Sequence, residues 1–320
     1  MNIGFFGDGE WGVGALRLLV DAGHKIDFVV GRTNGDDTDL KALAHSLDTP
    51  FLNFDNVNHD DSVLALAQYG SCLFVSMSFD QIIRPELLGV PPQGFVNCHA
   101  GALPFYRGRN PLNWALINDE KRFGITAHYI DEGIDTGAIL VQEFFSISDS
   151  DDYQSLLAVA IEHCPKVLLK AVDAIASGTQ KPIVQAEIHP LGFYCGRRGQ
   201  GDEIINWQWN SRALFNFIRA ITTPGPGAIT HLAQGGSLAL LSAEEIPQAP
   251  NYRATVGEVV GRSKGGVVVK TQDSTLMITR AAWVEKGPMG EPFIPQFPIG
   301  TRLTASANPY AVQSTLEVSR

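Results

Sequence analysis

The chain has 320 residues, with 34 acidic and 24 basic side chains, so its formal net charge at pH 7 is −10. Hydrophobic residues make up 44% and charged residues 18%, which is typical of a globular protein rather than a disordered or membrane-spanning one. The length predicts two domains. The acidic excess disfavours a general nucleic-acid binder, because phosphate contacts need clustered Lys and Arg.

The first residues and the cysteines indicate the compartment. Residues 1–6 have no basic start and end at a glycine turn, so they indicate a first strand rather than a signal peptide. No apolar run is long enough to cross a bilayer. The four cysteines are widely spaced and form no CxxC pair. We therefore expect a cytoplasmic protein with reduced thiols and no membrane partner.

Strand and helix signals alternate along the first half of the chain. The predicted strands are 3–7, 25–30, 50–54, 71–76 and 94–99, and the predicted helices are 13–22, 40–47 and 61–68. This alternation predicts an α/β fold with a doubly wound, mostly parallel sheet. Such sheets bind ligands beyond the carboxyl ends of their strands.

The second half predicts a different architecture. A strand pair over 123–130 and 139–145 precedes a helix over 151–176, which Pro165 should kink or interrupt. Residues 177–205 are rich in Gly, Pro and Arg and indicate a connecting segment. A helix over 211–221 and short β-prone runs follow, which predict a small OB-like β-barrel. The expected domains are 1–190, a linker over 191–209, an OB-like domain over 210–305 and a polar tail over 306–320.

A GxGxxG pattern over 7–12 lies between the first strand and the first helix. Such a turn can hold a dinucleotide pyrophosphate, and Arg32 after the second strand would then contact a 2′-phosphate. That interpretation gives an NADP-dependent oxidoreductase as one alternative. Glu10 and Trp11 are awkward inside a phosphate cradle, so a tight strand-to-helix turn is favoured.

Asn97 and His99 lie two residues apart at the end of a predicted strand, so their side chains share one face. An amide donor beside an imidazole can stabilise an oxyanion and move a proton. Cys98 and His99 have no further ligands in range for a zinc site.

Two loops carry further charged groups. Arg107 and Arg109, between Gly and Pro residues, can bind a carboxylate or a phosphate. Asp131, Glu132 and Asp135 lie between glycines; calcium is one use for them, although the spacing does not fit an EF-hand. A carboxylate that orients a histidine is the more economical use.

The order of these motifs resembles the folate-dependent formyltransferase family, which includes methionyl-tRNA formyltransferase. The resemblance rests on Asn97-x-His99, the Leu103-Pro104 loop with Arg109, residues 124–126, and Gly133-x-Asp135-Thr136-Gly137. Residues 106–114, 196–198, 205–207, 217–220, 226–228 and 300–303 are similar to the formyltransferase that acts on UDP-4-amino-4-deoxy-L-arabinose. The resemblance extends to about residue 304 and is weakest over 32–70 and 229–290.

The resemblance implies transfer of a formyl group from 10-formyltetrahydrofolate to a primary amine in the N-terminal domain, without a metal. By this analogy Asn97 donates to the developing oxyanion, and His99 donates to it and carries the proton. Asp135 would lie near the histidine and favour its charged form. The family analogy also implies a set of cofactor contacts: Gln81, Ile82, Ile83, Arg109, Asp131, Glu132, Gly133 and Ile134. Residues 100–102 are smaller here than is frequent in the family, which would change the shape of the site.

The acceptor is a separate question. Methionyl-tRNA enzymes of the family carry a basic loop after the second strand, whereas residues 33–39 hold three aspartates and no basic residue here. This loop would repel RNA phosphate. We therefore expect a nucleotide-linked amino sugar as substrate, as in lipopolysaccharide or O-antigen biosynthesis, and a homodimer as the commonest assembly. Candidate acceptor contacts, by stacking or by pairing with diphosphate, are Trp11, Tyr106, Trp114 and Arg219.

Several alternatives remain open. If the chain belongs to this family, one alternative acceptor is methionyl-tRNA, and another is an amino-acid derivative, such as an ornithine in siderophore or peptide synthesis. Hydrolysis of formyltetrahydrofolate would use water in place of the amine. A non-catalytic folate or nucleotide-sugar binding protein would leave Asn97, His99 and Asp135 without a chemical role.

Overall fold

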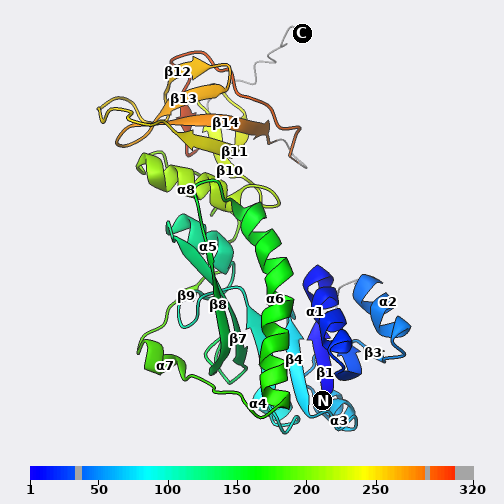
Figure 1. Cartoon of the computed structure of the whole chain (residues 1–320). Helices are drawn as coiled ribbons and strands as arrows, with labels where there is room; N and C mark the ends of the chain where they lie inside the picture. The colour runs from blue at the N-terminus through cyan, green and yellow to red at the C-terminus, as the bar shows by residue number, and fades with distance from the viewer. Residues whose placement is uncertain (33–37, 285–288, 307–320) are drawn as a thin grey trace. The chain divides into compact units, whose positions relative to one another are not determined.

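The computed structural model describes residues 1–32, 38–284 and 289–306 (Figure 1). The chain forms two compact units, and each draws on separate stretches of sequence. The first comprises Met1–Pro111, Arg122–Ser146 and Leu157–Arg197, and the second comprises Leu112–Lys121, Ile147–Leu156 and Arg198–Arg320. The contacts therefore do not divide at one point in the chain. The expected boundaries at 190 and 210 stay a prediction of which segments fold independently.

The first unit contains a seven-stranded sheet in the order β3-β2-β1-β4-β5-β7-β8. Its strands are β1 (Asn2–Gly7), β2 (Lys25–Val30), β3 (Phe51–Leu52), β4 (Leu73–Met77), β5 (Phe95–His99), β7 (Arg122–Tyr129) and β8 (Ile139–Ser146). The first five pair in parallel, and β7 and β8 run antiparallel. The predicted α/β fold with a doubly wound, mostly parallel sheet is confirmed. The strands β1 and β4 are almost wholly buried, as their apolar sequences require.

Helices cover this sheet. They are α1 (Gly9–Asp21), α2 (Thr38–Ser46), α3 (Asp60–Ala67), α4 (Pro85–Leu88), α6 (Tyr153–Ala176) and α7 (Gln185–Ile188). Helix α6 continues through Pro165, so the interruption, one of the two effects expected of this proline, does not occur. The neighbours Cys164, Val167 and Leu168 are fully buried, and this packing outweighs the backbone hydrogen bond that proline removes. Gly14 of α1 leaves room for the Pro165 ring.

A cluster of aromatic rings lies under the ends of the central strands. The Phe6 ring centroid lies 5.8 Å from that of Phe28, 5.4 Å from that of Phe74 and 4.9 Å from that of Phe95. All four side chains are buried. Tilted and edge-on aromatic pairs of this kind stabilise beyond the area they bury. These ring contacts hold β1, β4 and β5 against one another. Polar residues follow directly at the carboxyl ends of these strands.

The second unit contains a six-stranded antiparallel sheet in the order β12-β13-β14-β11-β10-β15. Its strands are β10 (Ala228–Leu232), β11 (Ser237–Glu245), β12 (Val259–Ser263), β13 (Gly266–Lys270), β14 (Thr275–Trp283) and β15 (Leu303–Thr304). An antiparallel bridge between Glu258 and Arg302 joins the two outer ends of the sheet. This closure confirms the expected small β-barrel domain. The expected tail beyond residue 306 lies outside the described residues.

Two helices belong to the second unit besides the barrel. Helix α8 (Ser211–Ile221) has the predicted bounds, and its N-cap Asn210 accepts a hydrogen bond from the Ala213 amide at 2.8 Å. In α5 (Pro111–Ile117), Asn113 Nδ2 donates to the Ala220 carbonyl at 2.6 Å. Among the described residues, no helix is long and apolar enough to span a membrane.

Candidate active site

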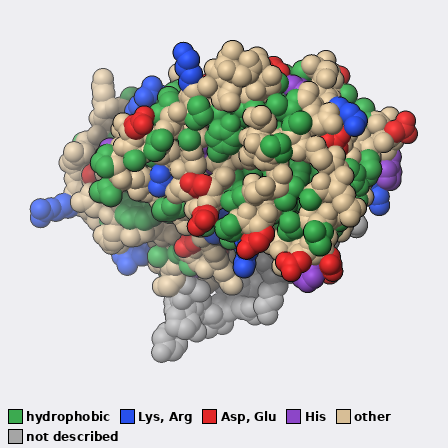
Figure 2. Space-filling model, turned by 90° about the horizontal axis from the view of Figure 1, so that it is seen from below, with side chains coloured by type: hydrophobic (Ala, Val, Ile, Leu, Met, Phe, Trp, Pro, Cys, Tyr) green, Lys and Arg blue, Asp and Glu red, His purple; other side chains and the backbone are tan. Residues whose placement is uncertain are grey.

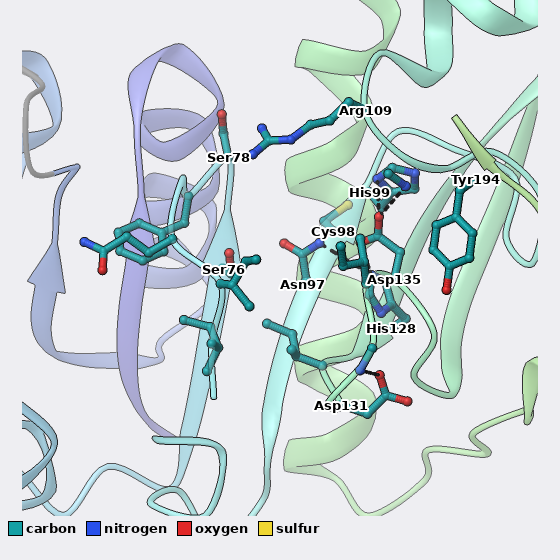
Figure 3. Close-up of a pocket in the computed structure, with 18 of the residues that line it drawn as sticks. Ser76, Ser78, Asn97, Cys98, His99, Arg109, His128, Asp131, Asp135 and Tyr194 are labelled. Atoms are coloured by element: carbon teal, nitrogen blue, oxygen red, sulfur yellow. Dashed lines mark hydrogen bonds and ion pairs between the residues drawn. The ribbon is translucent and has the colours of Figure 1, made fainter. Parts of the chain in front are cut away.

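A cavity of about 460 Å³ opens at the carboxyl ends of β4 and β5 (Figure 3). Its lining comes from these strand ends, from β7, from the loop after β7 and from residues 194–195. This is where a doubly wound sheet binds ligands. All of these elements belong to the first compact unit. The position of Asn97 and His99 at such a strand end agrees with the sequence prediction.

Asn97 and His99 both line this cavity from β5. His99 is buried, and its Nε2 donates to the Tyr106 carbonyl at 2.7 Å, while Nδ1 lies 3.7 Å from Asp135 Oδ2. The ring is therefore oriented from both sides. Cys98 lies between the two residues, and its Sγ contacts the Cys164 carbonyl of α6 at 3.4 Å.

Asp135 lies where the two other members of the predicted trio meet (Figure 3). Its Oδ2 accepts a hydrogen bond from the Gly108 amide at 2.8 Å, and its Oδ1 lies 3.5 Å from His128 Nε2. Burial alone would raise the pKa of Asp135. The charge of His99, the hydrogen bond and charge of His128, and the Gly108 amide outweigh burial and hold this pKa well below its ordinary value. The carboxylate is thus ionised at neutral pH.

His128 is a site residue that the sequence analysis missed. It stands opposite Asn97 in the antiparallel pairing of β5 with β7, and Asn97 Nδ2 lies 3.4 Å from His128 Nε2. Its Nδ1 donates to the Tyr129 carbonyl at 2.8 Å, so Nε2 is the atom that faces Asn97 and Asp135. Two residues after Thr126, His128 shares that strand face, which was a readable signal. The residue that stands opposite His128 on β5 could not be predicted from the sequence, because it depends on the register between the two strands.

Most of the predicted cofactor contacts come together in the same cavity. Its lining includes Gln81, Ile82, Ile83, Arg109, Asp131, Gly133 and Ile134, whereas Glu132 is not among the described lining residues. The Gln81 amide is engaged elsewhere: it accepts from the Val57 amide at 2.9 Å and donates to the Phe54 carbonyl at 3.0 Å. These two hydrogen bonds fix the orientation of the Gln81 side chain at the cavity wall.

The Asp131 side chain shapes the turn in which it lies. Its Oδ1 accepts hydrogen bonds from the Gly133 amide at 3.1 Å and from Thr136 Oγ1 at 2.5 Å. In the part of the chain that the structure describes, no group of three or more His, Cys, Asp and Glu side chains is arranged to hold a metal ion.

The predicted acceptor contacts are not gathered at this cavity. None of the described lining residues is Trp11, Tyr106, Trp114 or Arg219. Tyr106 is buried and offers its carbonyl to His99. Trp114 and Arg219 belong to the second unit, where Arg219 donates to the Ser148 carbonyl at 2.6 Å. Their roles toward the acceptor stay predictions.

Arg32 and Cys195 also lie at or near the cavity, and neither is suited to chemistry there. Arg32 pairs with Asp8 at 2.8 Å and donates to the Ser78 carbonyl at 2.8 Å, so its contacts fix the cavity rim. Cys195 lines the cavity, and burial raises its pKa to about 11. It is a protonated thiol at neutral pH and a poor nucleophile.

Comparison with known proteins places the chain in a family. The formyl transferase model matches residues 15–172, and the model of the formyl transferase C-terminal domain matches residues 199–294. The methionyl-tRNA formyltransferase of Thermodesulfovibrio yellowstonii is 31% identical over 283 residues, which cover 86% of this chain and 88% of that protein. That of Pelotomaculum thermopropionicum is 28% identical over 287 residues, with 87% and 90% covered.

Solved structures share the fold. WlaRD, a sugar 3N-formyl transferase crystallised in the presence of dTDP and 5-N-formyl-THF, matches with a TM-score of 0.65 and 21% identity over 90% of this chain and 99% of that one. The N-formyltransferase of Helicobacter canadensis, in complex with folinic acid and dTDP-3-aminofucose, matches with a TM-score of 0.61 and 19% identity over 87% and 98%. The matches of both domain models, with 31% identity to a methionyl-tRNA formyltransferase over 86% of the chain, show that the chain belongs to the formyl transferase family.

Proposed function

We propose that this formyltransferase moves the formyl group of 10-formyltetrahydrofolate to the primary amine of a nucleotide-linked amino sugar. The observation that carries the transfer chemistry is the convergence of Asn97, His99 and Asp135 at one end of a cavity. A hydrogen-bond donor, an oriented imidazole and an ionised carboxylate are the groups that amine attack on a formyl carbon needs.

The cavity suits the flat ring of a folate. Phe79, Ile82, Ile83, Ile130 and Ile134 supply apolar surface, and the turn at 131–135 supplies polar groups at one edge. Ligand sites commonly combine apolar walls with a few fixed polar groups in this way. The similar structures of WlaRD and the Helicobacter canadensis enzyme contain 5-N-formyl-THF and folinic acid, which supports a folate donor here.

The trio divides the work of the transfer. Bound 10-formyltetrahydrofolate supplies the formyl carbonyl and the leaving nitrogen. Asn97 Nδ2 donates a hydrogen bond to the oxygen on which negative charge develops. Because Nε2 of His99 is engaged with the Tyr106 carbonyl, Nδ1 takes the proton from the attacking amine and delivers it to the leaving nitrogen. The ionised Asp135, 3.7 Å from Nδ1, stabilises the protonated imidazole.

Charge favours a small acceptor. The net charge is −10, and three aspartates lie within residues 33–39, of which 33–37 are outside the described residues and Thr38 and Asp39 belong to α2. On the face in Figure 2, acidic side chains stand among hydrophobic ones, and most Lys and Arg side chains stand apart from one another. RNA binding draws most of its affinity from clustered positive charge. A homodimer stays a prediction.

A second acceptor is favoured by a separate observation. The curated relatives, at 26–35% identity, are named methionyl-tRNA formyltransferases. Initiator methionyl-tRNA is therefore the second candidate. An amino-acid derivative such as an ornithine stays a third possibility for the test.

A parallel formyl-transfer assay tests the proposal. Purified protein and 10-formyltetrahydrofolate are incubated with UDP-, TDP- and GDP-linked amino sugars, with initiator methionyl-tRNA and with ornithine. Mass spectrometry then detects the gain of one formyl group. Formylation of one sugar that is lost in His99→Ala supports the proposal. Formylation of the tRNA or ornithine alone assigns that acceptor instead, and formyl loss without any acceptor indicates a hydrolase.

Ile82→Asp is expected to weaken binding of 5-formyltetrahydrofolate about tenfold, because the exposed Ile82 side chain is proposed to cover the folate ring. Full burial of an isoleucine contributes about 1.5–3 kcal/mol, and a tenfold change in the dissociation constant corresponds to about 1.4 kcal/mol. Titration calorimetry measures the dissociation constant. Ile299→Asp is the matched control, because Ile299 is an isoleucine of similar exposure that belongs to the second unit and does not line this cavity. Equal dissociation constants for Ile82→Asp and the wild type would place the folate elsewhere.

A further inference from the structure

The segment 183–195, expected to be mainly connecting chain, forms part of the wall around the trio. We call it the strap. At its start, the Ile183 amide donates to the Ile139 carbonyl and the Ile139 amide donates to the Ile183 carbonyl, each at 2.8 Å. At its end, β9 (Tyr194–Cys195) pairs in parallel with β6 (Arg107–Gly108), and both residues of β9 line the cavity. The strap is thus fastened at β8 and at the loop beside the site.

Gln185 is the buried polar side chain of the strap, only 2% exposed. Its Nε2 donates to the carbonyls of Asp135 and Gly137, both at 2.8 Å. Its Oε1 accepts from Arg107 Nε at 3.0 Å and from a terminal nitrogen of Arg107 at 2.6 Å. Both N–H donors and the oxygen of the Gln185 amide are therefore hydrogen-bonded, so burial of this side chain leaves no polar atom without a partner.

These contacts close a ring around Asp135. Gln185 holds the Asp135 carbonyl and the Arg107 side chain. The next residue after Arg107 is Gly108, whose amide donates to the Asp135 carboxylate at 2.8 Å. The backbone and the carboxylate of Asp135 are thus tied to the same short stretch of chain. The strap adds a second tie there, because the Arg107 amide donates to the Phe193 carbonyl at 3.2 Å.

The loop that carries Asp135 needs such support. Asp135 has φ = 53°, a left-handed conformation that a non-glycine residue adopts at some cost. Two residues on, a Cβ at Gly137 would stand 1.8 Å from the Tyr129 carbonyl, so the chain passes very close to β7. A small shift of this loop changes the distances from Asp135 to His99 and His128.

We propose that Gln185 is a positioning residue for formyl transfer, which fixes the Asp135 carboxylate against His99 and His128 without contacting the substrates. This inference rests on the proposed function. Glutamate at this position would keep the acceptor for Arg107 but, when ionised, offers no proton to the Asp135 and Gly137 carbonyls. Two buried carbonyls would then lose their donor and face a negative charge. Because displacements of about 1 Å at a reacting group can cost up to about 100-fold in rate, the effect should appear in kcat.

The test compares Gln185→Glu and Gln185→Ala with the wild type and with Gln93→Glu, which changes an exposed glutamine of the same unit. Circular dichroism and thermal midpoints establish that each variant is folded. We expect kcat to fall by about 10–100-fold in both Gln185 variants, a larger factor than the rise in the KM for 10-formyltetrahydrofolate, because the Asp135 carboxylate acts in the transition state and Gln185 itself does not line the cavity. Gln93→Glu should match the wild type.

A double-mutant cycle separates positioning from general support of the fold. If Gln185 acts through the Asp135 carboxylate, Gln185→Glu should reduce kcat less than about threefold further in an Asp135→Asn background. If the effects of Gln185→Glu and Asp135→Asn on kcat multiply fully in the double variant, the inference is wrong and the proposed function stands. The same holds if the wild type is active and the Gln185 variants have its kcat. A wild type that formylates no amine overturns both.

Discussion

Asp135→Asn is expected to lower kcat for formyl transfer about 1,000-fold, a loss of about 4 kcal/mol of transition-state stabilisation. Asparagine has the shape of aspartate and can still accept from the Gly108 amide. It carries no charge, so the protonated His99 would lose the carboxylate that lies 3.7 Å from its Nδ1. Steady-state kinetics with both substrates saturating measure the effect, and a loss smaller than tenfold would contradict the role given to this charge.

The lowered pKa of Asp135 determines the pH range in which this carboxylate can change its charge in the wild type. The pKa of Asp135 is lowered in the folded protein, so the carboxylate stabilises the fold above its unfolded pKa, and this stabilisation is lost as pH falls through the folded value. No limb of the wild-type activity profile between about pH 5 and 9 should therefore come from Asp135, whose ordinary pKa is already about 3.9.

Asp48→Asn is the control for the loss of kcat in Asp135→Asn, since the exposed Asp48 also has a positive φ, 51°. It should retain full activity.

His99→Gln is expected to reduce kcat by about 1,000-fold, at the centre of the range seen when a positioned acid or base is removed. Glutamine can still donate to the Tyr106 carbonyl, which now accepts from His99 Nε2 at 2.7 Å, but it cannot take up and release a proton. The dissociation constant for 5-formyltetrahydrofolate should stay within about threefold of the wild-type value, because the substitution leaves in place the apolar walls and the turn at 131–135 that are proposed to hold the folate.

The matched control is His45→Gln, which changes an exposed histidine of α2. It should leave kcat and folate binding unchanged. Retention of more than a tenth of wild-type kcat in His99→Gln would show that another group moves the proton. His128, which lies 3.5 Å from the same carboxylate, would be the first to examine.

Local patterns determined much of the fold. The predicted bounds of β2 and α8 agree with the structure residue for residue. Each of these elements combines a clear hydrophobic period or apolar run with an adjacent turn or cap, so neighbouring residues suffice to define it. The short elements β6 and β9 were not expected. They are two residues long and exist only because each pairs with the other across a long stretch of chain.

The site shows the same division. The spacing of Asn97 and His99 placed both side chains on one face of a strand, and the family resemblance added Asp135. His128 was missed because its role depends on the antiparallel register of β7 against β5. Gln185 and Tyr194 were missed because they lie in a stretch without periodicity, where no local signal indicates burial or a cavity.

The sequence by itself determined the alternating fold of the first unit, the barrel of the second, the formyl transferase family and the identity of the predicted trio, since each follows from local spacing or from motifs. Only the tertiary structure decided how these groups are held. The Gly108 amide on the Asp135 carboxylate, the Tyr106 carbonyl on His99 and the Gln185 amide behind the loop join segments up to 50 residues apart. Such contacts depend on the packing of the whole unit, which no local propensity encodes.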